Sequence, residues 1–264
     1  MISKEVVNAL KLVATEERRK VNEWFFKTGK GEYGYGDIFL GVTAPEIRRI
    51  AKKFSQEISL QELTELIRNP IHEVRLCALI ILVNKYKKEN SDKIYQYYMD
   101  HLTAINNWDL VDSSAPYIVG DYLYKHPEKS KILIDFSHSE NLWVRRISIV
   151  STFAFIKNNE FNKTLEIAKL LLNDDQDLIH KAVGWMLREI YKRDKRIIKR
   201  FLKQNYALIP RTTLRYAIER MDKEERFLYL KEILMCHKDK IKNVVTSMKN
   251  SHPYESFSYT VIRM

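Results

Sequence analysis

The amino-acid sequence predicts an all-α protein in which one kind of helical hairpin is repeated and stacked into a right-handed solenoid. Two observations predict this fold class. Only seven glycines and six prolines occur in 264 residues, of which 45% are hydrophobic, so turns are too rare for a β-sandwich, a barrel or a disordered tail. A four-residue pattern also recurs every 34 or 35 residues, a length that suits one helical hairpin with its loops.

Composition limits the cellular location and the cofactors that the protein is expected to have. Two cysteines, Cys77 and Cys236, cannot build a disulfide scaffold, and the first residues contain no apolar signal core. No segment approaches the ~20 apolar residues of a membrane span. The seven histidines have no metal-type spacing with one another or with the cysteines. We therefore expect a cytoplasmic monomer without membrane association, metal or other cofactor.

The N-terminal elements are two helical segments around one irregular region. Residues 3–26 predict one helix or two short ones, and five of the seven glycines then fall between residues 29 and 41. Pro45 fits the first turn of the next helix, which continues over residues 46–54. The sequence thus predicts N-terminal helices over residues 1–55 that carry a Gly-rich loop, 29–41.

Beyond residue 55 the chain predicts short antiparallel helices separated by loop and cap residues. These interruptions are Asn69-Pro70, Asn106-Asn107, His126-Pro127, Asn158-Asn159, Asn173-Asp174 and Ile209-Pro210.

The repeat is visible when five segments are aligned at residues 76, 111, 146, 181 and 215. The third residue of each segment is small or β-branched, which lets neighbouring helices approach closely: Ala78, Ser113, Ser148, Val183 and Ala217. The Trp, Leu-Gly and Tyr pattern of tetratricopeptide repeats is absent, so a HEAT-like repeat fits better. We expect a single HEAT-like repeat domain over residues 1–240, with about five stacked helical pairs between 60 and 235, and a C-terminal extension, 241–264, to which no role is assigned.

Positive charge is concentrated near the C-terminal end. Residues 181–240 contain 17 Lys and Arg against eight Asp and Glu, a net charge of +9 out of +11 for the whole chain. A charge run of this kind is compatible with the solvated face of a helix, but a basic end on a near-neutral body also indicates a polyanion-binding surface. We expect a concave basic face that binds DNA.

Three of the four tryptophans share a helix face with a charged residue. Trp108 and Asp112 are four residues apart, and Trp143 and Arg146 are three apart. Trp185 lies in a stripe of cations on one face, formed with Lys181, Arg188 and Lys192. A Trp flanked by cations is hard to bury, because its burial would bury the charges as well.

Structural interpretations remain open beside these functional ones. Trp143 fits a core residue, since the start of its helix is apolar on that side. Trp108 could equally be a packing residue with Asp112 as a cap or ion-pair partner. Asp109 suits the dipole of a helix start. Of Arg145 and Arg146, one could be solvated and the other paired with a neighbouring helix.

Several motifs in one order resemble the AlkD-like alkylpurine DNA glycosylases, bacterial DNA alkylation repair proteins built of HEAT-like repeats. The motifs are FLGVTAPEIRR, NNWDLVD, NLWVRRISIV, HKAVGWMLRE and IPRTTLRYAIERM, and they cover most of the chain up to Met221. The resemblance implies cleavage of the N-glycosidic bond of N3- and N7-alkylated purines in double-stranded DNA, as in base excision repair, without a metal and without a base-binding pocket.

The resemblance also assigns residues. It implies catalytic roles for Trp108 and Asp112, a cleft arginine at Arg146 and a second cleft tryptophan at Trp185. It implies that four basic residues bind DNA phosphates: Lys181, Arg188, Arg211 and Arg215. The YGYGD segment of the Gly-rich loop departs from the family pattern, and the resemblance leaves open whether Tyr33, Tyr35 or Phe39 contacts DNA.

The assigned residues suit this chemistry. An alkylated purine that carries a positive charge leaves as a neutral base, so the remaining task is to stabilise an oxocarbenium-like sugar. A carboxylate such as Asp112 can do this and can orient the attacking water, while the faces of Trp108 and Trp185 attract the cationic nucleotide. Arg146 would bind a phosphate beside the lesion.

The alternative is a non-catalytic HEAT-repeat scaffold that binds branched or duplex DNA or a protein partner. A DNA-binding scaffold has no reason to place Asp112 opposite phosphates, so this residue separates the two hypotheses.

Overall fold

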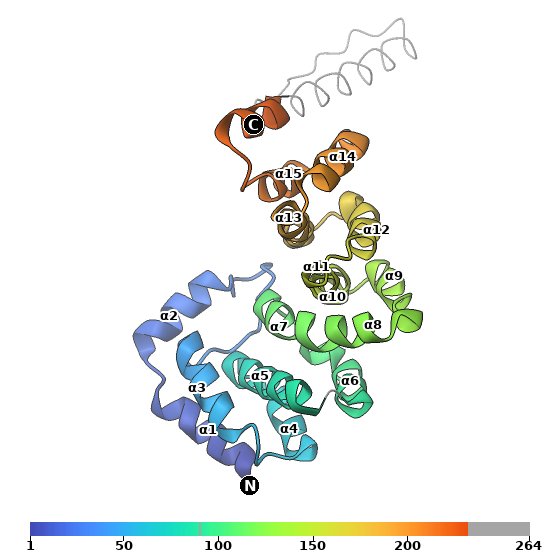
Figure 1. The fold of residues 1–264 in the computed structure, drawn as a ribbon. Helices are drawn as coiled ribbons and strands as arrows, with labels where there is room; N and C mark the ends of the chain where they lie inside the picture. Colours follow the sequence, from blue (N-terminus) through green and yellow to red (C-terminus); the bar gives the residue numbers. More distant parts are fainter. Residues whose placement is uncertain (90, 232–264) are drawn as a thin grey trace, which may run out of the picture.

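The computed structural model describes residues 1–89 and 91–231 (Figure 1). Within these residues the regular structure is helical, and the one β-contact found there is an isolated bridge between Ile38 and Ile71. The predicted all-α fold class is confirmed. The expected C-terminal extension, 241–264, lies outside the described residues, as do residues 232–240 of the expected repeat domain.

The helices have the following bounds. In the N-terminal half they are α1 (Ile2–Leu12), α2 (Glu16–Phe25), α3 (Ala44–Phe54), α4 (Leu60–Ile67), α5 (His72–Glu89), α6 (Asp92–Met99) and α7 (Trp108–Ser114), which a π-helical turn η2 (Pro116–Gly120) joins to α8 (Asp121–Lys125). In the C-terminal half they are α9 (Ile132–Ser137), α10 (Leu142–Ser151), α11 (Phe153–Lys157), α12 (Asn162–Leu170), α13 (Asp177–Tyr191), α14 (Lys195–Asn205) and α15 (Arg211–Ala217). Short 3-10 turns are η1 (Leu102–Ala104), η3 (Pro127–Lys129) and η4 (Leu171–Asn173).

Helix starts lie where the sequence provides cap residues. Ser59 forms a capping box with Glu62 at the start of α4, and the Asp194 carboxylate accepts two backbone N–H groups at the start of α14. The Asn107 side chain accepts from the Trp108 backbone N–H at the start of α7, and the Asn141 side chain accepts from the Trp143 backbone N–H at the start of α10. These side chains satisfy N–H groups that have no partner inside the helix, so the boundaries follow from local sequence.

The repeats stack so that one layer of helices runs through the molecule. Helices α3, α5, α7, α10, α13 and α15 contact one another in succession, and α4, α6, α9, α12 and α14 lie in the other layer (Figure 1). We call the first set the inner layer. The five aligned segments lie in α5, α7, α10, α13 and α15, so the predicted register places the same face of each repeat in the inner layer.

Close helix packing in this layer depends on small residues. A Cβ atom added at Gly184 of α13 would lie 2.5 Å from the Tyr216 Cβ and 2.6 Å from the Thr213 carbonyl oxygen of α15. A larger residue at 184 would therefore force the two helices apart. Of the five recurring residues, four are fully buried, as predicted: Ala78, Ser148, Val183 and Ala217. Ser113 is only partly buried, so the prediction of close packing does not hold equally for α7.

In two of the five repeats an arginine ties the hairpin loop to its inner helix. Arg75 and Arg145 occupy the same repeat position, one residue before the aligned segment. The Nη1 group of Arg75 donates to the Asn69 and Pro70 carbonyls, and that of Arg145 to the Ser139 and Glu140 carbonyls, all at 2.9 Å. Each arginine also pairs with an aspartate at 2.6 Å: Asp37 for Arg75 and Asp174 for Arg145.

Candidate active site and nucleic-acid interface

A cavity of about 850 Å³ lies between α2, α3, α5 and α7. Aromatic side chains, carboxylates and cations meet in its lining. The aromatic residues are Phe25, Phe26, Trp108 and Tyr117, and the carboxylates are Glu73, Glu89, Asp109 and Asp112. The cations are Arg18, Arg48, Lys52, Lys85, Lys87 and Lys88. The cavity thus joins the predicted residues Trp108 and Asp112 to a basic rim.

Asp112 of α7 and Arg146 of α10 form a bidentate ion pair. Nε and Nη2 of Arg146 donate to the two carboxylate oxygens of Asp112 at 2.9 and 2.8 Å. The third group, Nη1, donates to the Leu178 carbonyl at 2.5 Å. Burial raises the pKa of Asp112 above its ordinary value, and the charge and hydrogen bonds of Arg146 oppose this rise. Arg146, which is only 5% exposed, therefore fixes the orientation of the Asp112 carboxylate, whose side chain remains 19% exposed.

Trp108 is half-buried at the start of α7 and belongs to an aromatic cluster. Its ring stacks on Phe26, with centroids 5.4 Å apart and planes 19° apart, and meets Phe25 edge-on at 5.8 Å. Trp108 thus packs against α2 and also lines the cavity beside Asp112. Both interpretations of this residue, packing and substrate contact, are compatible with this position.

The structure places Trp185 and the predicted phosphate-binding residues farther along the inner layer, outside the cavity lining. Trp185 is half-buried on α13 and packs on Phe153, with ring centroids 6.2 Å apart. On the same helix, Lys181 pairs with Asp177 at 2.7 Å and Arg188 pairs with Glu219. Arg211 and Arg215 of α15 are exposed and make no ion pair with the described residues. The inner layer thus presents a second basic area about two helices away from Asp112.

The two structural alternatives near α10 are resolved. Trp143 is only 9% exposed and is a core residue, as expected. The expectation that one of Arg145 and Arg146 is solvated is wrong, because each pairs with an aspartate of a neighbouring repeat. Arg146 pairs with Asp112 of the preceding repeat, and Arg145 pairs with Asp174, which follows it in the chain.

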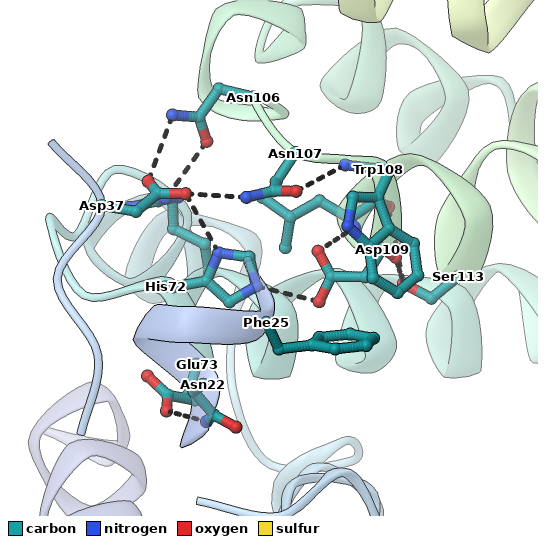
Figure 2. Close-up of polar contacts among 12 residues, drawn as sticks. Asn22, Phe25, Asp37, His72, Glu73, Asn106, Asn107, Trp108, Asp109 and Ser113 are labelled. Carbon is teal, nitrogen blue, oxygen red and sulfur yellow. Dashed lines mark hydrogen bonds and ion pairs between the residues drawn. The ribbon is translucent and has the colours of Figure 1, made fainter. Parts of the chain in front are cut away.

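A buried charge cluster that sequence reasoning missed supports the site (Figure 2). His72, only 1% exposed, donates from Nε2 to Asp109 at 2.8 Å, and its Nδ1 lies 3.4 Å from an Asp37 oxygen. The two carboxylates raise the pKa of His72 to about 9 against the opposing effect of burial, so the ring is an imidazolium. The pKa of Asp37 is lowered to about 2 because its hydrogen bonds to His72 and Asn107 and the charge of Arg75 outweigh desolvation.

This cluster connects the Gly-rich loop to the start of α7. Asn107 donates to Asp37 at 2.9 Å and accepts from the Trp108 backbone N–H at 2.8 Å, so the loop and the tryptophan share one hydrogen-bond chain. The neighbouring Glu73 accepts from the backbone N–H groups of Leu40 and Gly41 at 2.9 Å. His72 and Asp109 are 37 residues apart, about one repeat, and this separation was the signal available in the sequence.

The sequence did not predict the cations around the cavity, because the net charge of a long stretch counts buried and exposed residues alike. Lys85, Lys87 and Lys88 lie in a stretch whose acidic residues cancel their charge in the sum. Several of those acidic residues are buried or paired, whereas Lys87 and Lys88 are exposed at the cavity rim. Net charge counted separately for the inner layer and for the other layer would reveal this basic area.

In residues 1–89 and 91–231, no group of three or more His, Cys, Asp or Glu has a geometry that could hold a metal ion. No helix in these residues is both long enough and apolar enough to cross a membrane.

The fold and the site define a helical-repeat protein whose inner layer combines carboxylate, aromatic and basic groups. The chain belongs to the DNA alkylation repair enzyme family, whose model matches residues 6–221. This membership confirms the resemblance noted in the motifs and assigns the chain to DNA alkylation repair.

Solved structures support the fold. A predicted DNA alkylation repair enzyme from Enterococcus faecalis superposes with a TM-score of 0.66 at 17% identity, covering 80% of this chain and 97% of that one. AlkD2 from Streptococcus mutans superposes with a TM-score of 0.50 at 18% identity, covering 84% of this chain and 98% of that one. No curated protein matches the sequence.

Proposed function

We propose that this protein is a DNA glycosylase that hydrolyses the N-glycosidic bond of cationic N3- or N7-alkylated purines in duplex DNA. The observation that carries the proposal is Asp112, a carboxylate oriented by Arg146 and placed beside Trp108 in the cavity. Such a group stabilises an oxocarbenium-like sugar and orients the attacking water, while the positively charged base leaves without a general acid. In this proposal Arg146 acts on Asp112 rather than on a phosphate.

The alternative is a non-catalytic scaffold that binds DNA or a protein, and one observation favours it. All three donor groups of the Arg146 guanidinium are engaged within the protein, so the Asp112–Arg146 pair also satisfies the requirements of a purely structural ion pair. The choice between the two functions therefore depends on whether Asp112 affects a reaction rate.

The deciding experiment is single-turnover release of 7-methylguanine from duplex DNA, with equilibrium binding measured in parallel. Asp112→Asn keeps the shape of the side chain and removes its charge, so we expect the rate to fall by roughly a hundredfold or more. Binding should be unchanged or slightly tighter, because one negative charge opposite the phosphates is gone.

The control removes a negative charge elsewhere on the inner layer. Asp177→Asn on α13 changes an exposed carboxylate that does not line the cavity, and we expect the wild-type rate. Because Asp112→Asn leaves the Arg146 guanidinium buried without a counter-charge, rates are compared where circular dichroism shows both variants folded. Equal rates for Asp112→Asn and wild type would exclude the catalytic role, and no release by wild type would favour the scaffold.

A further inference from the structure

A tyrosine on the π-helical turn η2 holds two lysines from neighbouring repeats. The Nζ atom of Lys87, near the end of α5, lies 5.1 Å from the centroid of the Tyr117 ring, and the Nζ atom of Lys157, at the end of α11, lies 5.3 Å from it. Both distances suit cation–π contacts. Helices α5 and α11 lie on opposite sides of the segment formed by α7, η2 and α8 (Figure 1). We call these three residues the tyrosine–lysine cluster.

The two lysines of the cluster have no counter-charge from the protein. Both are exposed, and neither forms an ion pair or a side-chain hydrogen bond with the described residues. The neighbouring Lys88, by contrast, donates to the Gln56 side chain at 3.0 Å. Two ammonium groups held on one ring repel each other, and an anion between them removes this repulsion. The cluster therefore favours an anion.

Aromatic packing fixes the position of Lys157. Its Nζ atom also lies 5.0 Å from the centroid of Phe153, and Phe153 packs on Trp185 of α13 with ring centroids 6.2 Å apart. The rings of Tyr117, Phe153 and Trp185 are half-buried, so packing holds them while part of each remains accessible. The lysines thus lie on a row of rings that runs along the inner layer from the cavity to α13.

The cluster lies close to the candidate catalytic carboxylate. Tyr117 and Lys87 line the same cavity as Asp112. Asp112 and Tyr117 are five residues apart in one helical segment, a distance of about 7 Å along the helix axis. Consecutive nucleotides of one strand are about 3.4 Å apart along a duplex. An anion at the cluster therefore lies within about two nucleotides of a sugar at Asp112.

Arg146 is not available to bind a phosphate at this place. Its three donor groups are engaged by the Asp112 carboxylate and the Leu178 carbonyl. The basic residues of α13 and α15 lie farther along the inner layer, beyond α10. Lys87 and Lys157 provide free positive charge at the distance that a strand over Asp112 requires.

We propose that Lys87 and Lys157 together bind one backbone phosphate of the damaged strand, within about two nucleotides of the lesion, and that Tyr117 positions their ammonium groups. The inference deepens the proposed glycosylase function and rests on it for the identity of the nucleotide at Asp112. A phosphate fixed at the cluster sets the register of the strand, so that the sugar of the lesion meets the Asp112 carboxylate. The two lysines are then substrate-binding residues, and Tyr117 is a positioning residue.

The test measures whether the lysines and a particular phosphate charge depend on each other in the full chain. The probe is a duplex with one tetrahydrofuran abasic-site analogue, in which single phosphates around the analogue are replaced in turn by an uncharged methylphosphonate. For wild type, we expect one replacement within about two nucleotides of the analogue to weaken binding roughly tenfold. In the double variant Lys87→Gln with Lys157→Gln, the same replacement should have little effect, because the charged partners are already gone.

The control is a double variant in the other layer. Lys169→Gln with Lys203→Gln removes two exposed lysines of α12 and α14, and its response to each methylphosphonate should match that of wild type. Tyr117 is tested by two substitutions. Tyr117→Phe keeps the ring and should respond as wild type, whereas Tyr117→Leu should reduce the effect of the critical methylphosphonate. A tyrosine that only supports the fold would change affinity without changing this dependence on one phosphate.

The outcomes separate this inference from the proposed function. If wild type releases no 7-methylguanine but the effect of one methylphosphonate depends on the two lysines, the phosphate contact stands and the glycosylase proposal fails. If release depends on Asp112 but every methylphosphonate weakens the Lys87 and Lys157 double variant as much as wild type, the contact is overturned and the glycosylase proposal stands. The absence of any methylphosphonate effect in wild type, or the same loss of this effect in the control variant, would also overturn the contact.

Discussion

At the scale of single residues, repeat spacing explains which charged groups meet. Asp112 and Arg146 are 34 residues apart, close to the repeat length, and therefore lie side by side on adjacent inner helices. The sequence predicted both residues and their helix faces, but it assigned Arg146 to a phosphate. The ion pair could have been inferred by comparing residues one repeat apart, whereas the depth at which it is buried depends on packing that the sequence pattern does not contain.

His72 predicts a particular dependence of stability on pH. Its pKa is raised from 6.5 to about 9 in the folded protein, so its contribution is fully present below pH 6.5 and is lost as pH rises through 9. Asp37 acts in the opposite sense: its pKa is lowered from 3.8 to about 2, so its contribution is present above pH 3.8 and is lost as pH falls through 2. We expect the wild-type free energy of unfolding to decrease by on the order of 2 kcal/mol between pH 6.5 and 9 because of His72.

The measurement is denaturant unfolding across this range for wild type, His72→Gln and His138→Gln. The uncharged glutamine should remove most of the decline, and the exposed His138 serves as the control that leaves it unchanged. A wild-type decline that persists in His72→Gln would show that another group titrates.

At the scale of elements, local sequence determined the helices but not the route of the Gly-rich loop. Cap residues and the small residue of each repeat predicted where inner helices begin and where they pack. The loop is instead fixed by contacts between distant residues, such as Asp37 with Asn107 and Leu40 with Glu73, which are 70 and 33 residues apart. Such contacts follow from the stacking of repeats, so the loop could be recognised as irregular while its partners could not be predicted.

The close contact of α13 with α15 predicts that Gly184→Ala, which adds one carbon atom, lowers the stability of the protein. Gly184→Ala improves helix propensity but places a Cβ against the Tyr216 Cβ and the Thr213 carbonyl oxygen. We expect a net destabilisation of about 1–3 kcal/mol, measured by denaturant unfolding, because the crowded atoms belong to backbone and Cβ positions that cannot rotate away. Gly29→Ala is the control, since the nearest atoms there belong to the flexible Glu32 side chain, and its effect should stay within about 0.5 kcal/mol. A more stable Gly184→Ala variant would mean that the two helices separate at little cost.

At the scale of the whole molecule, two basic areas lie on either side of Asp112 along the inner layer. One surrounds the cavity at α3 and α5, and the other is carried by α13 and α15. Duplex DNA that contacts both areas would pass over α7, the helix that carries Trp108 and Asp112. The sequence revealed the second area through its net charge and missed the first, because net charge over a window ignores the layer to which each residue belongs.

The position of charge, rather than its amount, should therefore set the salt dependence of DNA binding. Arg211→Ala with Arg215→Ala removes two exposed cations from the inner layer that have no ion-pair partner among residues 1–89 and 91–231. The slope of log affinity against log salt for undamaged duplex should then fall by about two, one for each lost phosphate contact. Arg200→Ala with Lys203→Ala removes two exposed cations from α14 in the other layer and should leave the slope close to that of wild type. Fluorescence anisotropy titrations at several salt concentrations give all three slopes. Equal reductions in both double variants would mean that DNA responds to the total charge of this end and that the inner layer does not define the binding face.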